Sequence, residues 1–132
     1  MVEAELILKV PFHDIDPLEI VWHGNYIKYF EMARAELLDL IDYNYEQMRQ
    51  SGYAWPIIEV KLRYIKPATY GQTIKVHAKL TEHEYRMKIN YVIYDVQTGE
   101  RLTKGHTIQV AIDMKKEQLC LASPDVFLKK IV

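Results

Sequence analysis

The sequence predicts an α+β fold in which a curved antiparallel β-sheet wraps around one long central α-helix. An amphipathic helical pattern covers residues 25–41, and four segments with apolar–polar alternation follow it. Alternation with a period of two is typical of antiparallel strands that bury one face. A stripe that repeats every 3.6 residues is typical of a helix. Because one helix covers little more than one face of a sheet, we expect the sheet to curve around it.

Bulk composition narrows the class of protein. The 132 residues suit one domain over residues 1–132, and the net charge of -1 gives no reason to expect nucleic acid. No apolar run approaches the ~20 residues of a membrane-spanning helix, and the N-terminus lacks the pattern of a signal peptide. Cys120 is the only cysteine, which favours a reducing, cytoplasmic location without an intrachain disulfide.

The helices are predicted from periodicity and from signals at their ends. A short helix is expected over 45–52, where Gly52 ends it. A terminal helix is expected over 123–132, with Ser123 as N-cap and Pro124 as its first residue. In the long helix, the residues expected to face the sheet are Tyr26, Phe30, Ala33, Leu37, Leu40 and Ile41.

Five segments are predicted to be strands, namely 6–12, 54–67, 73–80, 86–95 and 106–114, with a tight turn at 97–100. Alternation in the last strand predicts that its apolar residues are buried and its polar residues exposed. The residues expected on the buried face are Ile108, Val110, Ile112 and Met114, opposite Thr107, Gln109 and Asp113. Such a sheet leaves edges and an outer face, which favour pairing with a second copy.

The stretch HDIDPLEIVWHGNY, residues 13–26, holds most of the polar chemistry. It contains His13, Asp14, Asp16, Glu19 and His23 between the first strand and the long helix. These residue types can bind metals, but their spacing matches no known compact ligand pattern. We therefore predict neither a bound metal nor another cofactor.

Two interpretations of Asp16 remain open from the local pattern. Asp16, Pro17 and Glu19 fall at the N-cap, N1 and N3 positions of a near capping box, which is a purely structural role. A carboxylate can also activate water or attack directly, and the free amides of a nearby helix start can hold a developing oxyanion. That combination suits hydrolysis of an activated ester. Asp14 is expected to make a local turn hydrogen bond.

The pattern D-I-D-P-x-x-I-V-W-H-G-N-Y-x-x-Y-F-E-x-A-R, which starts at Asp14, resembles the signature of the 4-hydroxybenzoyl-CoA thioesterase family. This family belongs to the hotdog-fold acyl-CoA thioesterases. The resemblance implies a hotdog fold and hydrolysis of acyl-CoA or acyl carrier protein thioesters to the free acid. It also implies a homodimer with two sites at the subunit interface, often paired further into a tetramer.

The resemblance assigns roles to individual positions. The catalytic carboxylate falls on Asp16, as nucleophile or as general base, and the backbone amides of His23 and Gly24 would polarise the thioester carbonyl. One departure stands out, because many members carry glycine where this chain has Glu19. Glu19 is interpreted either as the capping residue described above or as a charge that raises the pKa of Asp16.

Substrate-binding residues are predicted outside the signature as well. Tyr26 is expected in the core, with a place in the acyl pocket as the alternative. Arg86 and Lys88 project from one strand and are candidates for the CoA phosphates or for the acidic surface of a carrier protein. Two other functions stay open: a non-catalytic hotdog protein that binds acyl thioesters, and a hotdog dehydratase.

Overall fold

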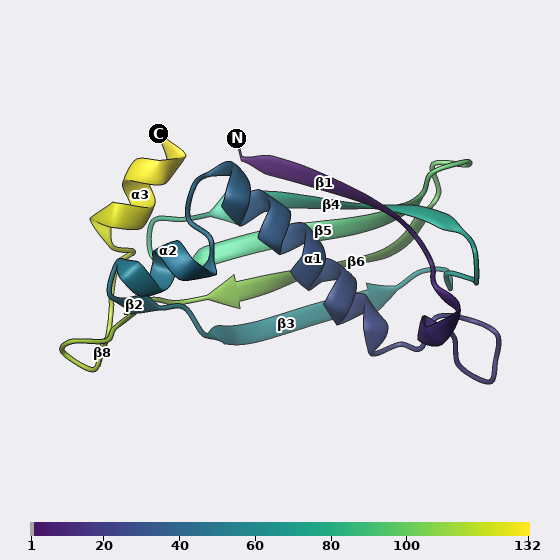
Figure 1. Cartoon of the computed structure of the whole chain (residues 1–132), viewed down its shortest axis with the longest axis horizontal. Helices are drawn as coiled ribbons and strands as arrows, with labels where there is room; N and C mark the ends of the chain where they lie inside the picture. Colours follow the sequence, from purple (N-terminus) through teal and green to yellow (C-terminus); the bar gives the residue numbers. More distant parts are fainter. Residues whose placement is uncertain (1) are drawn as a thin grey trace.

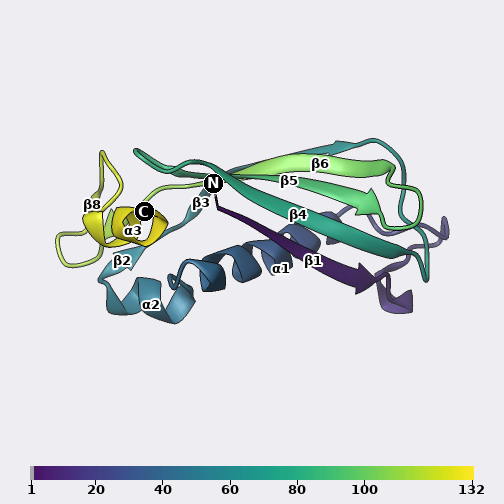
Figure 2. The same cartoon turned by 90° about the horizontal axis from the view of Figure 1, so that it is seen from above.

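In the computed structural model, which describes residues 2–132, the long helix α1 lies across one face of a five-stranded sheet (Figure 1). The strand order is β1-β4-β5-β6-β3, and every neighbouring pair is antiparallel. Seen from above, the sheet curves over α1 (Figure 2). The predicted fold class is therefore confirmed. The elements are β1 Glu3–Lys9, α1 Asn25–Leu40, β3 Ile57–Tyr64, β4 Thr73–Glu82, β5 Met87–Asp95 and β6 Arg101–Gln109.

The shorter elements gather at the two ends of α1. A 3₁₀ turn, η1, leads from β1 toward the start of the helix, while α2, α3 and a small sheet of order β2-β7-β8 lie near its far end (Figure 1). The sequence did not predict this small sheet. The bounds are η1 Phe12–Asp14, α2 Tyr45–Gln50, β2 Tyr53–Ala54, β7 Ile112–Asp113, β8 Gln118–Leu119 and α3 Asp125–Ile131.

An aromatic stack joins α1 to the sheet at Phe30. The Phe30 ring stacks on the Tyr91 ring of β5, with centroids 4.3 Å apart and planes 6° apart. Gly105 of β6 lies directly opposite Tyr91 in the sheet. A Cβ atom on Gly105 would lie 2.9 Å from Phe30 Cε2 and 2.1 Å from the backbone oxygen of Lys61 in β3. The absence of a side chain at position 105 therefore allows this approach.

The buried face of α1 differs from the prediction at one position. Leu40, the last residue of α1, is 65% exposed. Arg34 is buried instead. Its Nη2 forms an ion pair with Glu31 and donates a 3.0 Å hydrogen bond to the Tyr45 hydroxyl of α2, whereas among residues 2–132 its buried Nη1 has no hydrogen-bond partner. A charged side chain can occupy this helix face because partners from two helices compensate its burial.

The phase predicted for the last strand was wrong for Thr107 and Gln109, although Ile108 is buried as predicted. In β6 the buried inner positions include Thr107 and Gln109, opposite buried Ile89 and Met87 of β5. Tyr91 Oη and Thr107 Oγ1 lie 2.8 Å apart, and Gln109 Nε2 donates to the Trp55 carbonyl at 2.8 Å. These bonds offset part of the burial, because among residues 2–132 the buried Gln109 Oε1 has no hydrogen-bond partner. The strand also ends at Gln109, so Ile112 belongs to β7 and Met114 is exposed.

Several element boundaries also differ from the predictions. The segment predicted as one strand over 54–67 is divided between β2 and β3, and the strand predicted over 106–114 begins at Arg101. The first strand spans Glu3–Lys9 rather than 6–12, because the chain turns into η1 after Pro11. The terminal helix begins at Asp125 with Pro124 as N-cap. Ser123 therefore does not cap it, and among residues 2–132 its buried hydroxyl has no hydrogen-bond partner. The short helix α2 is capped by Asn44 and Gln47, which form a capping box, and Gly52 follows its C-cap as expected.

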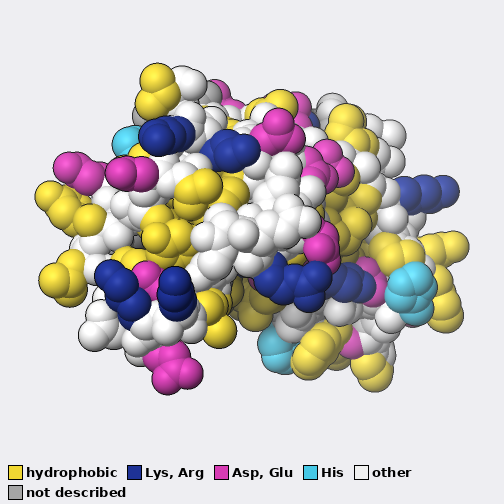
Figure 3. Space-filling model, turned by 60° about the vertical axis from the view of Figure 1, so that its left-hand side comes forward, with side chains coloured by type: hydrophobic (Ala, Val, Ile, Leu, Met, Phe, Trp, Pro, Cys, Tyr) yellow, Lys and Arg dark blue, Asp and Glu magenta, His cyan; other side chains and the backbone are white. Residues whose placement is uncertain are grey.

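Strand β3 forms one edge of the five-stranded sheet, and three of its apolar side chains are exposed to solvent. Ile58, Val60 and Tyr64 are between 41% and 58% exposed. On the side that carries α2 and α3, hydrophobic side chains reach the surface in separate groups between charged ones (Figure 3). Across residues 2–132, no helix combines the length and the apolar character needed to cross a membrane.

Candidate active site

Residues 16–20 form a tight turn rather than the start of a helix. The Asp16 carbonyl accepts from Glu19 N at 2.9 Å, and Asp16 N donates to the Ile20 carbonyl at 2.9 Å. Asp16 Oδ1 accepts from Leu18 N at 2.8 Å, as in an Asx turn. The predicted capping box of Asp16 and Glu19 was therefore wrong. Asp16 does stabilise its own loop, but it does so through one oxygen of its carboxylate.

The backbone conformation of Glu19 explains why many members of the family carry glycine at this position. Its φ is 66°, in the left-handed region that favours glycine. A residue with a Cβ is strained there, which explains why glycine suits this position of the turn. The side chain of Glu19 is exposed and does not reach back to cap Asp16.

Asp14 makes contacts with α1 instead of the local turn bond that was predicted. Its side chain is 3% exposed, and its two oxygens accept from Lys28 Nζ at 2.5 Å and from Tyr29 Oη at 2.7 Å. Burial alone would raise the pKa of Asp14, but the hydrogen bonds from Lys28 and Tyr29 and the charge of Lys28 lower it below its ordinary value. Asp14 is therefore a charged, buried link between the loop and the first turns of the helix.

The long helix starts directly after a close contact of two loop residues. Gly24 is the N-cap of α1, and a Cβ atom there would lie 2.2 Å from the Trp22 ring. Asn25 N donates to the Trp22 carbonyl at 2.9 Å. Within residues 2–132, the backbone N–H groups of His23 and Gly24 make no hydrogen bond. These two donors are therefore free, as the interpretation of a helix N-terminus next to a carboxylate requires.

One pocket brings together three of the predicted residues. Asp16, His23 and Tyr26 line a cavity of about 340 Å³ at the end of α1. Tyr26 is 2% exposed, and its hydroxyl accepts from Ala68 N at 3.1 Å, so it serves both the core and the pocket wall. Gly24 is adjacent in sequence but does not line the cavity.

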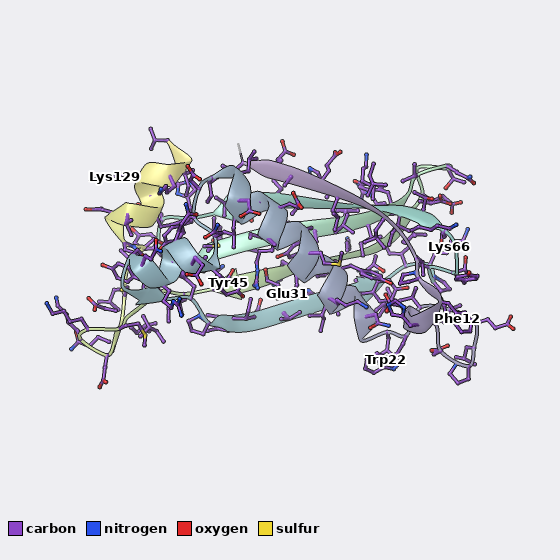
Figure 4. All side chains as sticks on the ribbon, in the orientation of Figure 1. Phe12, Trp22, Glu31, Tyr45, Lys66 and Lys129 are labelled. Atoms are coloured by element: carbon purple, nitrogen blue, oxygen red, sulfur yellow. The ribbon has the colours of Figure 1, made fainter. Side chains whose placement is uncertain are left out.

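Two further residues of this pocket were not predicted. Tyr64, the last residue of β3, donates its hydroxyl to the His23 carbonyl at 2.8 Å. Lys66 lines the same cavity and pairs with Glu100 at 3.2 Å. Figure 4 shows Lys66 and Trp22 at the same end of the molecule, opposite Lys129. The sequence contains no motif for them, and only the register of β3 brings Tyr64 to the loop.

The predicted cations Arg86 and Lys88 lie away from this pocket within one chain. Lys88 is opposite Ile108 on β6, whereas Tyr64 is paired with Thr103. Five residues of antiparallel strand separate these positions, which is roughly 17 Å. Arg86 and Lys88 lie 2.9 and 3.9 Å from the Glu82 carboxylate, and Lys88 points to the outer face of the sheet.

The polar side chains of the loop do not converge on one point. Among residues 2–132, no three His, Cys, Asp or Glu side chains are grouped so that they could hold a metal ion. Asp14 is turned inward, while His13 and His23 are exposed. The pocket is lined by the Asp16 carboxylate and by His23, and the two free backbone N–H groups belong to His23 and to Gly24, which directly follows it in the chain. Such an arrangement can activate water, or attack a carbonyl carbon, while it stabilises the developing oxyanion.

Comparison with known proteins identifies the family. Residues 10–131 match the family model described as the thioesterase-like superfamily. The chain belongs to the thioesterase-like superfamily. The match spans β6, α1, the loop and the pocket, so it covers every residue of the candidate site.

Named relatives within the thioesterase-like superfamily have similar lengths. A protein of Bacillus subtilis, YneP, provisionally named an acyl-CoA thioesterase, is 28% identical over 122 residues, which cover 89% of this chain and 88% of that protein. A provisionally named esterase of Synechocystis is 30% identical over 123 residues, covering 92% of this chain and 74% of the relative.

Solved structures agree in fold. A DHNA-CoA thioesterase of Staphylococcus aureus superimposes with a TM-score of 0.81 at 23% identity, covering 92% of this chain and 81% of that one. A 1,4-dihydroxy-2-naphthoyl-CoA thioesterase of Synechocystis gives a TM-score of 0.87 at 18% identity, with coverages of 98% and 95%. At these identities the likeness concerns the fold, which is the hotdog fold of this superfamily.

Proposed function

We propose that the chain is an acyl-CoA thioesterase of the 4-hydroxybenzoyl-CoA thioesterase type, which hydrolyses acyl-CoA to a free acid and CoA. The observation that carries the proposal is that Asp16 and His23 line one pocket at the start of α1, where within residues 2–132 the N–H groups of His23 and Gly24 make no hydrogen bond. The D-I-D-P signature and the names of the relatives support the same activity.

The proposed chemistry follows one of two routes. In the first, an Asp16 oxygen attacks the thioester carbon, the CoA thiolate leaves, and water then hydrolyses the mixed anhydride. In the second, Asp16 takes a proton from water, which attacks the carbonyl directly. Backbone N–H groups stabilise the oxyanion in both. In a single turnover in H₂¹⁸O, label in the Asp16 carboxylate identifies the first route with water attack at the Asp16 carbon of the anhydride. Attack at the acyl carbon leaves Asp16 unlabelled, so rapid-quench detection of acylated Asp16 completes the test.

The first test removes the reacting charge and little else. Asp16→Asn keeps an oxygen that can accept from Leu18 N, so the turn should persist while kcat falls by at least about 100-fold. Asp39→Asn, on the exposed face of α1, is the matched control and should keep full activity. Full turnover by Asp16→Asn on every acyl-CoA would overturn the assignment of Asp16.

A homodimer is proposed on the open edge of the sheet. Pairing two copies along β3 about a two-fold axis would cover the exposed Ile58, Val60 and Tyr64. Antiparallel pairing also carries the opposite end of the partner's sheet toward the pocket of this chain. On this proposal, Arg86 and Lys88 of one copy contact the CoA phosphates at the pocket of the other. A dimer of dimers would extend the same assembly.

Subunit mixing tests this assembly directly. Asp16→Asn and the double variant Arg86→Ala/Lys88→Ala should each be impaired as pure dimers. A mixed dimer contains one pocket with both Asp16 and the two cations, so mixing should recover activity. The Glu82→Ala variant, which keeps the cations, is the control. No recovery in a verified mixed dimer would contradict a site shared between the copies.

Other substrates and functions remain as outcomes of a hydrolysis screen. Short, medium, long and aromatic acyl-CoAs should be compared with matched acyl carrier protein thioesters. Turnover of the carrier substrates alone would identify the carrier protein as partner. Binding without turnover would favour a non-catalytic hotdog module, and hydration of an enoyl thioester would favour a dehydratase. A cytoplasmic location stays a prediction of the cysteine content.

A further inference from the structure

The hydroxyl of Tyr64 ties the edge of the sheet to the turn directly before α1. It donates a 2.8 Å hydrogen bond to the His23 carbonyl, from a residue 41 positions further along the chain. The Tyr64 ring also packs edge-on against Tyr26, with centroids 5.3 Å apart. The phenol is therefore held at both its ring and its oxygen.

The hydrogen bond from Tyr64 to the His23 carbonyl also fixes the orientation of the Gly24 N–H. The C=O of His23 and the N–H of Gly24 belong to one planar peptide group, and no peptide among the described residues is cis. In a trans peptide these two groups point in opposite directions, so fixing one fixes the other. The preceding peptide is fixed in the same way, because the Trp22 carbonyl accepts from Asn25 N. Neither bond uses the N–H of His23 or Gly24.

We infer that Tyr64 is a positioning residue, which fixes the His23–Gly24 peptide so that the free Gly24 N–H is oriented toward the thioester carbonyl. The inference rests on the proposed thioesterase function. Tyr64, His23 and Asp16 line the same pocket, so the peptide that Tyr64 fixes begins at a residue of the pocket wall. Burial raises the pKa of the Tyr64 hydroxyl, so it stays a hydrogen-bond donor at neutral and moderately alkaline pH.

A positioning role predicts a specific kinetic signature. Oxyanion donors accelerate a reaction because they are held in place before charge develops. Without the hydroxyl, the His23 carbonyl lies in an exposed turn and can turn toward water, which releases the Gly24 N–H from its direction. The loss then falls on kcat, because the charge that this donor stabilises forms in the transition state. A tyrosine that only lined the pocket would instead change KM and the preferred acyl length.

The experiment compares Tyr64→Phe with Tyr94→Phe. Phenylalanine at 64 keeps the ring contact with Tyr26 and removes only the hydroxyl. Tyr94 lies on the outer face of the sheet, where among residues 2–132 its hydroxyl makes no hydrogen bond, and its ring contact with Lys75 survives the change. We expect Tyr64→Phe to lower kcat about 10-fold, with KM within about twofold of wild type. The Tyr94→Phe variant should match wild type in both constants.

A second readout does not depend on activity. The ¹³C carbonyl resonance of His23 and the amide resonance of Gly24 should move in Tyr64→Phe and stay in place in Tyr94→Phe. Unchanged kcat, or a loss confined to KM, would overturn the positioning role, and so would unmoved resonances. If the wild type hydrolyses no acyl thioester, the proposed function fails. The resonances then still decide whether Tyr64 fixes the peptide.

Discussion

The carboxylate of Asp14 accepts a hydrogen bond of 2.7 Å from the hydroxyl of Tyr29, and both side chains are buried. Lys28, the residue directly before Tyr29 on α1, also donates a hydrogen bond to the Asp14 carboxylate. Through these bonds the loop that presents Asp16 is attached to the helix whose first amides lie at the pocket. Loop position and helix position are therefore linked by one charged side chain two residues before Asp16.

Removing this link should destabilise the protein. Asp14→Ala leaves the Tyr29 hydroxyl buried without its acceptor and Lys28 without its counter-charge, so the free energy of unfolding should fall by about 2 kcal/mol. The value lies below that of a fully buried pair, because Lys28 is 46% exposed. Urea denaturation measures it, with the exposed Glu36→Ala as control. A loss no larger than that of Glu36→Ala would show that the contacts of Asp14 with Lys28 and Tyr29 do not stabilise the protein.

The same cluster should make stability depend on pH in a defined direction. The pKa of Asp14 is lowered in the folded protein, so its ionised form stabilises the fold above the ordinary pKa of 3.8. That contribution is lost as the pH falls through the lowered, folded-state pKa. The difference in unfolding free energy between wild type and Asp14→Asn should be full at pH 7 and shrink below about pH 4. A difference that is constant down to pH 2 would show that the charge is not responsible.

The strained turn at Glu19 should respond to glycine. Because φ at this position is 66°, Glu19→Gly should raise the free energy of unfolding by about 0.5–1 kcal/mol. Glu19→Gln keeps the Cβ atom and removes the charge, so it should leave stability unchanged. The pH profile of activity in Glu19→Gln tests the other interpretation, that Glu19 raises the pKa of Asp16. An unmoved profile eliminates that electrostatic role.

Gly24 should tolerate no side chain without a movement of Trp22. The added Cβ of Gly24→Ala would lie 2.2 Å from the Trp22 ring, which is half exposed and can swing outward. We expect acrylamide to quench the fluorescence of this variant more strongly than that of wild type. Measuring both in a Trp55→Phe background isolates the signal of Trp22. Equal quenching would show that the backbone moves instead.

Two cations face each other on the outer side of the sheet. Arg63 is directly opposite Lys104, whereas Lys79 is opposite Glu3. Like charges at opposed positions destabilise a sheet, and opposite charges support it. Lys104→Glu should therefore raise the unfolding free energy by about 0.5 kcal/mol, and Lys79→Glu should lower it by a similar amount. Both effects should weaken in high salt, and changes of the same sign in the two variants would refute the pairing argument.

The order of the long helix and the strands could be predicted from the sequence. One helix of 3.6-residue period and a series of alternating segments are enough to require a curved sheet, and α1 begins at Asn25 as predicted. The phase of β6 was not readable, because Thr107 and Gln109 turn inward only through hydrogen bonds to Tyr91 and to the Trp55 backbone. Those partners are distant in the sequence, and alternation alone favours the apolar residues.

In the candidate site too, local features could be predicted from the sequence and those that depend on tertiary packing could not. Asp16 and His23 were named from the polar stretch and from the family resemblance, and the fold brings them to one pocket, while their catalytic roles stay predictions. Asp14 was misjudged, because its partners Lys28 and Tyr29 lie on a helix whose rotation relative to the loop depends on tertiary packing. Tyr64 was missed for a similar reason. Its hydroxyl reaches His23 only when the register of β3 is known.

Position 105 limits how this chain can vary. A methyl group there would push against the main chain of β3 at Lys61, three residues before Tyr64, as well as against the Phe30 ring. In a saturation library, every substitution at 105 should be depleted, although position 105 does not line the pocket and lies outside the signature. Mutational tolerance at the centre of the sheet is thereby coupled to the geometry of the pocket at its end.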